Sequence, residues 1–267
     1  MPELPEVEYA RVSLEHWLRG ATIESIEVGD GRILDGSAAR LQRSLVGERV
    51  RAVDRRGKWL RVALEHGALF SHLGMTGKWV RVKPTETRRF ERLRIDARLR
   101  GASRSVRYLD PRLFGRLVFA DDGELPEWGA LGPDPLHDGL DRDALFEALQ
   151  RRSAPIKPTL MDQALIAGLG NIQVTEALFF ARIDPRRPSR SLSKKEVNAL
   201  VRGTDKTLRK TLADQVGPEI MYVEEPGAEN PFSIYGRGGE PCPRCGEKLH
   251  KIVLGGRGTV FCTSCQR

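Results

Sequence analysis

The sequence lacks the features that mark membrane and secreted proteins. No apolar run approaches the length of a transmembrane helix, and charged residues make up 30% of the chain. The first residues include Glu3, Glu6 and Glu8 and have none of the character of a secretory signal. We therefore expect a cytoplasmic protein that has no membrane partner.

Cysteine is absent from most of the chain, and all four cysteines fall near its end. They form two C-x-x-C pairs separated by sixteen residues, namely Cys242 with Cys245 and Cys262 with Cys265. Such pairs are typical of metal binding in a reducing compartment and not of disulfide bonding. The C-x2-C-x16-C-x2-C spacing predicts a zinc ribbon in which four thiolates hold one structural Zn²⁺ ion. A redox-active dithiol is the alternative interpretation of each pair.

The sequence has an excess of positive charge. Its formal net charge is +8 at pH 7, its isoelectric point is near 9.6, and arginine dominates its cations. The guanidinium group suits bidentate contacts with phosphate, so nucleic acid is the first candidate for a partner. Charge alone does not establish this, because many basic proteins bind no nucleic acid.

The first half of the chain has one helical segment followed by short strands. Apolar residues at helical spacing predict a helix over residues 4–18, which ends at Gly20. Glycine-punctuated apolar segments then predict strands at 23–28, 50–53, 59–64, 69–73, 79–82 and 117–119. Short strands with frequent turns indicate an antiparallel sandwich or barrel, and no βαβ alternation or internal repeat is visible.

The second half of the chain changes to helical patterns. A segment rich in proline, glycine and aspartate precedes helices predicted at 141–151, 156–166, 171–181 and 193–214. An irregular stretch follows at about 215–231. We expect an α+β protein with a helix-led β-sandwich domain at 1–125, a linker at 126–140, a helical domain at 141–231 and a zinc-ribbon hairpin at 232–267.

The stretch that begins Met1-Pro2-Glu3-Leu4-Pro5-Glu6 offers a nucleophile at the chain terminus. Removal of Met1, which a small second residue favours, would expose the secondary amine of Pro2. An α-amino group titrates near pH 8, so a usable fraction is neutral at cellular pH. Glu3 and Glu6 lie within one turn of it and could transfer protons. The alternative is an ordinary helix start, with proline and acidic residues in the first turn.

The string PELPEVE at this terminus resembles the signature of the formamidopyrimidine-DNA glycosylase and endonuclease VIII family, and further family-like strings follow in order along nearly the whole chain. The resemblance implies a bifunctional DNA glycosylase and AP lyase of base excision repair. Such an enzyme removes oxidised or ring-opened purines through an N-terminal proline Schiff base, with β,δ-elimination. It implies Pro2 as the nucleophile, Glu3 in sugar-ring opening and proton transfer, and Glu6 in shaping the local field.

The resemblance also implies the partners and cofactors. The expected partner is double-stranded DNA that contains damaged bases or abasic sites, and the expected enzyme is a nucleoid-associated monomer. Zinc would fold the hairpin, and the reaction would need no catalytic metal.

Three strings in the first half resemble family segments that contact DNA. Arg55-Arg-Gly-Lys-Trp-Leu60 would bring Lys58 to the phosphate or the lesion, and Ser71-His-Leu-Gly-Met-Thr-Gly77 would bring His72 to a phosphate. Met75 in the second string, together with Arg112 and Phe114 in Asp110-Pro-Arg-Leu-Phe-Gly115, would fill the void left by an extruded base. Filling that void offsets an unstacking cost of a few kcal/mol.

Strings in the second half resemble the helix-two-turn-helix segment and the zinc hairpin of the family. Lys157 and Asn171, the latter a predicted N-cap residue, would hold the DNA backbone, and Glu176 would be a supporting carboxylate in the active site. Arg257, in the predicted hairpin tip Gly255–Gly258, would engage the phosphates around the extruded nucleotide.

Several residues depart from the family pattern and leave the lesion preference open. They are Gln173, Thr175, Leu113, the segment Arg89-Phe-Glu-Arg92, and residues 214–230, which do not resemble the Ser/Thr-rich loop associated with 8-oxoguanine. Formamidopyrimidines, 8-oxoguanine, oxidised pyrimidines and bulkier adducts all remain candidates. Two other classes are also compatible with the sequence: a non-catalytic damage-binding protein and a zinc-ribbon factor for RNA.

Overall fold

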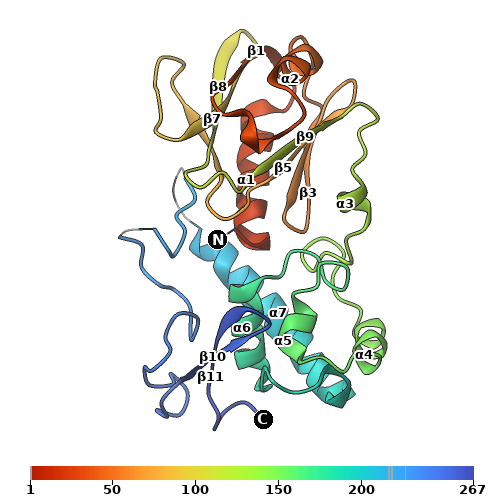
Figure 1. Ribbon diagram of the computed structural model, residues 1–267, viewed down its shortest axis with the longest axis vertical. Coiled ribbons are helices and arrows are strands. Elements are labelled where there is room, and N and C mark those ends of the chain that lie inside the picture. The colour runs from red at the N-terminus through yellow and green to blue at the C-terminus, as the bar shows by residue number, and fades with distance from the viewer. Residues whose placement is uncertain (1, 216, 218, 226) are drawn as a thin grey trace. The chain divides into compact units, whose positions relative to one another are not determined.

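The computed structural model describes residues 2–267 except 216, 218 and 226 (Figure 1). The chain divides into two compact units. The first extends to Ala130 and includes Gln215–Ala228, and the second comprises Leu131–Asp214 and Glu229–Arg267.

The first unit contains the helix α1 (Leu4–Leu18) and two β-sheets. One sheet has the strand order β1-β7-β8-β6 and the other the order β2-β9-β5-β4-β3. The predicted antiparallel pairing holds throughout except between β2 and β9, which run parallel. The remaining elements are β1 (Thr22–Val28), β2 (Leu34–Asp35), α2 (Ala38–Leu45), β3 (Ala52–Arg56), β4 (Trp59–Ala63), β5 (Ala68–His72), β6 (Lys78–Val82), β7 (Glu91–Leu99), β8 (Ala102–Leu109), β9 (Arg116–Ala120) and α3 (Pro126–Gly129).

The helix α1 organises the core of this unit. It contacts strands of both sheets and runs through the middle of the unit in Figure 1. Val7, Leu14 and Leu18 on its apolar stripe are fully buried against residues from the two sheets. Burial of each large aliphatic side chain contributes roughly 1.5–3 kcal/mol, so this packing holds the N-terminal residues in a fixed place.

The sequence prediction missed the two longest strands, β7 and β8. Their high charge obscured a regular alternation, in which Leu93, Ile95 and Ala97 point into the core while the intervening residues are charged. The period-2 pattern of one buried face was therefore present and could have identified β7.

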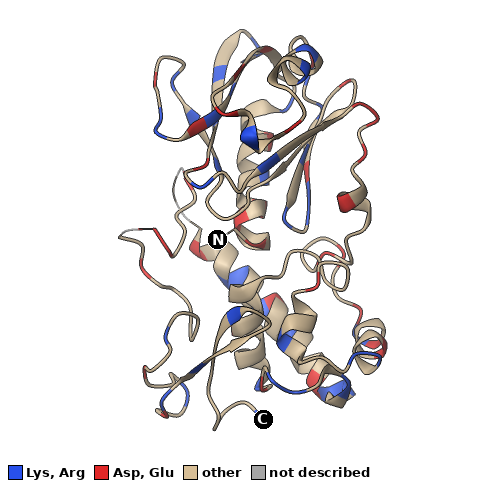
Figure 2. Ribbon diagram, viewed as in Figure 1, with Lys and Arg blue, Asp and Glu red and all other residues tan. Residues whose placement is uncertain are grey.

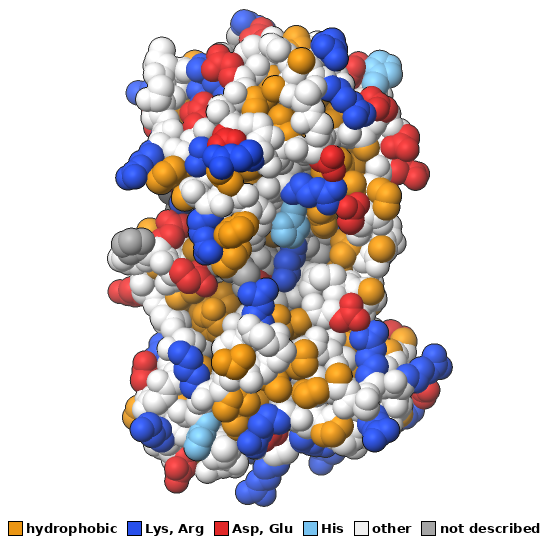
Figure 3. All heavy atoms as spheres, in the orientation of Figure 1, with side chains coloured by type: hydrophobic (Ala, Val, Ile, Leu, Met, Phe, Trp, Pro, Cys, Tyr) orange, Lys and Arg blue, Asp and Glu red, His pale blue; other side chains and the backbone are white. Residues whose placement is uncertain are grey.

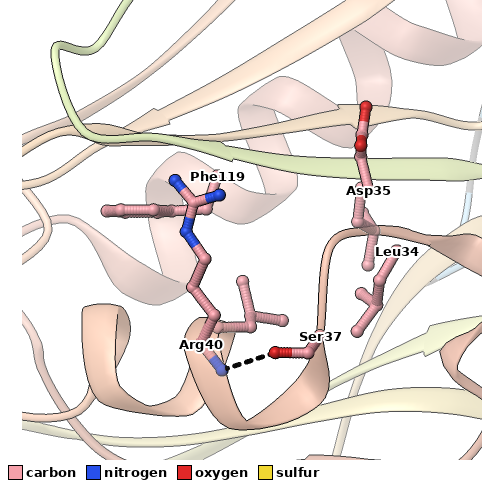
Figure 4. Close-up of a pocket in the computed structure, with 7 residues that line it drawn as sticks. Leu34, Asp35, Ser37, Arg40 and Phe119 are labelled. Carbon is pink, nitrogen blue, oxygen red and sulfur yellow. Dashed lines mark hydrogen bonds between the residues drawn. The ribbon is translucent and has the colours of Figure 1, made fainter.

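The prediction also missed the short helix α2. Its N-cap is Ser37, whose hydroxyl accepts a hydrogen bond from the backbone N–H of Arg40 at 3.2 Å (Figure 4). The adjacent pocket, lined by Leu34, Asp35 and Phe119 among others, has a volume of only about 10 Å³. A space of this size holds at most one water molecule.

The second unit is built from helices and one hairpin. Its elements are α4 (Arg142–Gln150), α5 (Ile156–Leu160), α6 (Asn171–Ala181), α7 (Lys194–Asp214), β10 (His250–Leu254) and β11 (Arg257–Phe261). The predicted helix 171–181 agrees with α6, and those at 141–151 and 193–214 agree within one residue at each end. No helix in the described ranges is long and apolar enough to cross a membrane.

The predicted helix at 156–166 is wrong beyond Leu160, where the chain turns. The side chain of Gln163 holds this turn together: its Oε1 accepts from the N–H of Gly168, and its Nε2 donates to the carbonyls of Met161 and Leu169, each at 2.8 Å. Gly168 has φ +90°, which favours glycine. These bonds produce two consecutive turns between α5 and α6, as the resemblance implied.

The described residues between 215 and 228 follow α7 in the chain but pack with the sheets. Ile220 and Tyr222 are buried in the core of the first unit, and the Tyr222 hydroxyl donates to the carbonyl of Gly77 at 2.6 Å. Lys78 and Arg88 form ion pairs with glutamates of the same segment. The stretch that the sequence assigns to the helical domain thus includes a segment that belongs to the first unit.

Candidate functional site

The start of α1 concentrates buried polar groups. Pro2, Glu3 and Glu6 are all buried, with 0% of Glu3 and 5% of Glu6 exposed. The backbone N–H of Glu3 donates to Glu6 Oε2 at 2.9 Å, and the Glu3 side chain accepts from the backbone of Glu6, which forms a capping box. The two carboxylates beside Pro2, Glu3 and Glu6, are therefore the same residues that cap the start of α1. The predicted removal of Met1 concerns a residue that lies outside those described.

The Glu6 carboxylate is harder to ionise than an ordinary glutamate. Burial, and then the nearby charge of Glu3, raise the pKa of Glu6 from 4.5 to about 7. Glu6 can consequently hold or release a proton near neutral pH. Burial, followed by the charge of Glu6, raises the pKa of Tyr222 well above its usual value, so this phenol stays protonated.

Lys58 lies in a two-residue turn between β3 and β4 that is anchored to α1. The Arg55 guanidinium donates through Nε to Glu8 Oε2 at 2.7 Å and through Nη1 to the carbonyl of Gly57 at 3.2 Å. Gly57, with φ +56°, allows the sharp reversal. A part-buried ion pair thus fixes the position of this turn relative to α1.

His72 is held as a neutral imidazole. Burial, and then the positive charges of Lys58 and Arg116, lower its pKa to about 4. Its Nδ1 accepts from the N–H of Gly74 at 3.1 Å, so the ring proton resides on Nε2. The ring meets Trp59 edge-on, with centroids 5.1 Å apart. His72 can therefore act as a hydrogen-bond donor through Nε2.

The structure brings together the loops that carry Met75, Arg112 and Phe114. A Cβ atom on Gly74 would lie 2.3 Å from the carbonyl oxygen of Phe114, so the two loops touch through their backbones. The Phe114 ring is 54% exposed, and the Arg112 guanidinium lies 4.9 Å from its centroid. The three side chains expected to fill a void in DNA thus come from two adjoining loops.

Asp110 organises these loops, and the sequence analysis did not single it out. Its side chain is fully buried. Oδ1 accepts from Thr76 Oγ1 at 2.7 Å and from the N–H of Arg112 at 3.1 Å, while Oδ2 accepts from the N–H of Gly115 at 2.8 Å. An aspartate that opens a turn before proline was the available signal.

In the second unit, Lys157 lies beneath the hairpin. Its side chain is fully buried, and Nζ donates to the carbonyl of Gly258 at 3.1 Å and to Thr259 Oγ1 at 2.7 Å. The ammonium group therefore connects α5 to β11.

Glu176 and Asn171 belong to α6. The Glu176 carboxylate accepts from the backbone N–H groups of Ser233, Ile234 and Tyr235 at 2.8–2.9 Å, so it fixes the chain that leads into the hairpin. Asn171 is the first helical residue, and the predicted N-cap assignment is wrong, since Gly170 occupies that position. The Asn171 Oδ1 atom is buried without a hydrogen-bond partner among the described residues.

Arg257 is exposed beside the hairpin turn and not at its tip. It is the first residue of β11 and pairs with Leu254 across a two-residue turn, Gly255-Gly256, in which both φ angles are positive. This glycine pair is typical of a type I′ turn. Gly255 also approaches Pro158, where an added Cβ would lie 3.0 Å from the proline side chain.

The four cysteines have the arrangement that zinc requires. Their Sγ atoms all lie within 4.8 Å of one another, with Cys242 to Cys265 at 4.0 Å and Cys245 to Cys262 at 3.5 Å. Tetrahedral thiolates about 2.3 Å from a shared ion would be roughly 3.8 Å apart. Burial opposes ionisation of Cys242, but backbone N–H groups of Arg244 and Cys245 outweigh it and lower the pKa of this thiol to about 7.

Comparisons with known proteins agree with this geometry. Three family models match the chain in order: the formamidopyrimidine-DNA glycosylase N-terminal domain at residues 1–117, the H2TH domain of that enzyme at 131–220, and the zinc finger found in FPG and IleRS at 239–267. The chain belongs to the formamidopyrimidine-DNA glycosylase family. The four cysteines accordingly hold one structural zinc ion.

Individual relatives match over the full length. The formamidopyrimidine-DNA glycosylase of Laribacter hongkongensis is 38% identical, with 100% of each chain covered. A crystal structure of the Lactococcus lactis glycosylase, non-covalently bound to DNA with an AP site, is 33% identical, covers 99% of each chain and has a TM-score of 0.87. The G226P mutant of that protein, in complex with DNA containing Fapy-dG, is 32% identical over 100% of each chain, with a TM-score of 0.88.

One departure from the family pattern has a structural explanation. Gln173 is fully buried between α6 and α7, where its Nε2 donates to Thr211 Oγ1 at 3.0 Å and its Oε1 accepts from Thr207 Oγ1 at 3.1 Å. Two threonines thus satisfy the buried amide. Nothing in the structure explains Thr175, whose buried hydroxyl has no partner within the described ranges.

Proposed function

We propose that this protein removes oxidised or ring-opened purines from double-stranded DNA by attack of the Pro2 amine on the sugar, and then cleaves the resulting abasic site. It is a DNA glycosylase of base excision repair, as its family membership and full-length matches to DNA-bound relatives indicate. The observation that carries the assignment to Pro2 is the buried carboxylate pair, Glu3 and Glu6, within one helical turn of that residue.

The proposed chemistry begins with the processed terminus. The neutral amine nitrogen of Pro2 forms a bond to C1′ as the glycosidic bond breaks. The base departs with the electron pair of that bond and takes up the proton that the Pro2 nitrogen loses. Glu3 gives a proton to O4′ as the sugar ring opens, which leaves an iminium between Pro2 and C1′. Glu6, with a pKa near 7, can then donate a proton to Glu3 and restore its acid form. Loss of a C2′ proton then expels the 3′ phosphate, and a further elimination expels the 5′ phosphate.

The other site residues act on the DNA. Lys58 and the Nε2–H of His72 contact phosphate, and Asn171 and Arg257 contact the backbone from the second unit. Met75, Arg112 and Phe114 occupy the space left by the extruded nucleotide. Lys157, which we expected to bind phosphate, has a positioning role through the hairpin, and Glu176 positions the segment before it. On the face of the first unit that Figure 3 shows, Lys and Arg side chains lie among hydrophobic side chains and several acidic ones, and Figure 2 marks the charged residues along the ribbon. The cations on this face suit a DNA partner. DNA as substrate also favours location at the nucleoid.

Borohydride trapping tests the nucleophile, and Glu3→Gln tests the acid. Intact-mass analysis should find Met1 absent, and reduction in the presence of lesion-bearing duplex should link protein and DNA covalently. Pro2→Gly should keep an amine at the terminus, but a weaker nucleophile.

Glu3→Gln should lower base release by about 10²–10⁴-fold while binding to an uncleavable abasic duplex is retained. Full base release by Glu3→Gln would contradict its role, and salt-sensitive binding without any trapped adduct would indicate a non-catalytic damage-binding protein.

A second candidate differs only in the preferred lesion. In place of a Ser/Thr-rich loop, residues 219–225 carry Tyr222, which is buried in the core of the first unit. Because a Ser/Thr-rich loop is associated with 8-oxoguanine, its absence makes oxidised pyrimidines or bulkier adducts the alternative substrates. A panel of duplexes that each carry one defined lesion would distinguish the two preferences through their relative kcat/KM values.

A further inference from the structure

The helix α1 is held differently on its different sides. It contacts β3 and β6, which are edge strands of the two different sheets, and one of its sides is buried in the core between them. The side toward β3 is bonded to that strand: Glu15 Oε2 accepts from the backbone N–H of Val53 at 2.6 Å. Glu8 Oε2 also pairs with Arg55 Nε at 2.7 Å. These bonds join α1 to β3.

On the side toward β6 there is a groove of about 420 Å³. This volume is within the range of ligand-binding sites. Five residues of α1 and one of β6 line the groove, namely Tyr9, Val12, Ser13, His16, Trp17 and Arg81. The five residues of α1 recur at helical spacing, so they form one continuous face roughly 12 Å long.

The floor of the groove is aromatic and aliphatic. Val12 is 51% exposed, and the rings of Tyr9 and Trp17 are half-buried at the margin of the core. The Tyr9 hydroxyl donates to the carbonyl of Gly217, which fixes the position of this ring. An apolar surface of this kind is available to a partner, because the core of the unit does not use it.

The polar side chains of the groove have no acceptor or donor of their own. Ser13, His16 and Arg81 form no side-chain hydrogen bond or ion pair with the residues that the structure describes. The acidic residues Glu8 and Glu15 of the same helix are engaged with β3. The groove therefore offers hydrogen-bond donors and an uncompensated guanidinium beside an apolar floor, and it is complementary to carboxylates that adjoin apolar side chains.

The strand β6 adds a free backbone edge to this groove. In its sheet β6 pairs only with β8, so the backbone along its other edge has no strand partner among the described residues. The segment that contains Tyr222 lies beside the start of β6, where the Tyr222 hydroxyl bonds Gly77 and Lys78 pairs with Glu225. An open edge of this kind can accept an extended peptide as a further strand.

We propose that the groove between α1 and β6 binds a short, extended, acidic and hydrophobic segment of a partner protein. The segment pairs with the free edge of β6, places an apolar side chain on Val12 and Trp17, and brings a carboxylate to Arg81. Because β6 has five residues, the bound segment has about five. DNA suits the groove less well, since duplex binding draws on many cations and the groove has one guanidinium.

Selection from a random peptide display library tests this proposal. The bait is the full-length protein saturated with a duplex that contains a tetrahydrofuran abasic analogue, so that acidic peptides do not collect on the DNA-binding surface. We expect the enriched peptides to share a motif in which acidic residues alternate with aromatic or aliphatic ones. Failure to enrich any motif, or a motif without acidic residues, would overturn the proposal.

Variants of the groove locate the bound peptide. Arg81→Glu and Val12→Asp should each weaken its binding by about tenfold or more, because they place negative charge against its carboxylates, whereas Arg81→Lys should retain most of the affinity. Arg43→Glu and Val46→Asp make the same changes at exposed positions in and beside α2 and should bind the peptide as the wild type does.

N-methylation of the peptide tests the strand addition. Only alternate N–H groups of an added strand point toward β6. A peptide that is N-methylated at one alternate set of amides should therefore lose binding, and a peptide methylated at the other set should keep it. Equal loss in both peptides, or loss in neither, would refute pairing with the edge of β6.

The outcomes separate this inference from the proposed function, which it goes beyond, since it requires neither Pro2 nor a lesion. Arg81→Glu and Val12→Asp should keep the wild-type Tm and the wild-type yield of the borohydride-trapped adduct. If both variants bind the peptide as the wild type does, or weaken binding of the duplex instead, the proposed groove is refuted. If the wild type forms no trapped adduct, the proposed function fails, and the selection repeated without DNA still tests the groove.

Discussion

At the scale of single residues, the site depends on polar groups that the fold removes from water. Glu6 is the clearest case, because burial beside Glu3 makes its charged form costly. The same cost makes Glu6 a proton carrier at neutral pH. His72 shows the opposite sign: burial and two cations favour its neutral form, which can donate through Nε2 without adding charge.

The pKa of Glu6 predicts a measurable pH dependence of stability. Because the folded form holds its proton up to about pH 7 and the unfolded form releases it near 4.5, the free energy of unfolding falls as pH rises between these values. Glu6→Gln removes the titrating group and with it this pH dependence of the free energy of unfolding. We expect the variant and the wild type to be similarly stable near pH 5, and the variant to be more stable by up to about 3 kcal/mol at pH 8.

Urea unfolding of both proteins at the two pH values measures this difference. Parallel stability curves would show that Glu6 titrates at an ordinary pKa. Glu8→Gln is not a suitable control, since Glu8 pairs with Arg55. Glu27→Gln, a change of a mostly exposed glutamate on β1, should leave the pH dependence as in the wild type.

At the scale of elements, short segments depend on buried polar anchors. Asp110 fixes two loops, Gln163 fixes the turns between α5 and α6, and Glu176 fixes the chain before the zinc hairpin. In each case one side chain satisfies several backbone groups that secondary structure leaves unpaired. These anchors therefore fix the conformation of the loops that they hold.

Lys157→Met tests the anchor between α5 and the hairpin. Methionine preserves much of the volume but leaves the carbonyl of Gly258 and the hydroxyl of Thr259 without their donor. We expect a loss of roughly 2 kcal/mol in unfolding free energy and weaker DNA binding, with zinc content unchanged. Lys195→Met, at an exposed position on α7, is the control. Unaltered stability would mean that the buried ammonium does not secure the hairpin.

At the scale of the whole molecule, the two units obtain their stability differently. The first has a large shared core that packs α1 against both sheets. In the second unit, the hairpin packs on a small hydrophobic cluster around Phe179, Ile234 and Leu249. The zinc-ligating residues Cys242 and Cys262 are buried in the same cluster. A small module of this kind needs the metal to fold.

Removal of zinc should therefore affect binding more than global folding. Cys242→Ser should release the metal and weaken affinity for the abasic-analogue duplex by roughly tenfold or more, while the calorimetric transition of the first unit stays in place. Metal analysis measures the zinc content, binding measurements give the affinity for DNA, and calorimetry follows the unfolding transition of the first unit. Ser264→Ala, between the ligands of the second pair, should retain zinc. Unchanged affinity after zinc loss would show that the hairpin does not face DNA.

The sequence by itself determined the zinc ligands, the family and the helices α1, α4, α6 and α7, because each depends on local spacing or on short strings. Only the tertiary structure decided the role of Asp110, the contact of the Gly74 turn with the Phe114 loop, the burial of Tyr222 and the pKa of Glu6. These depend on groups distant in the chain, whose mutual burial sets the free energy of charge and hydrogen bonding, and no local pattern encodes that environment.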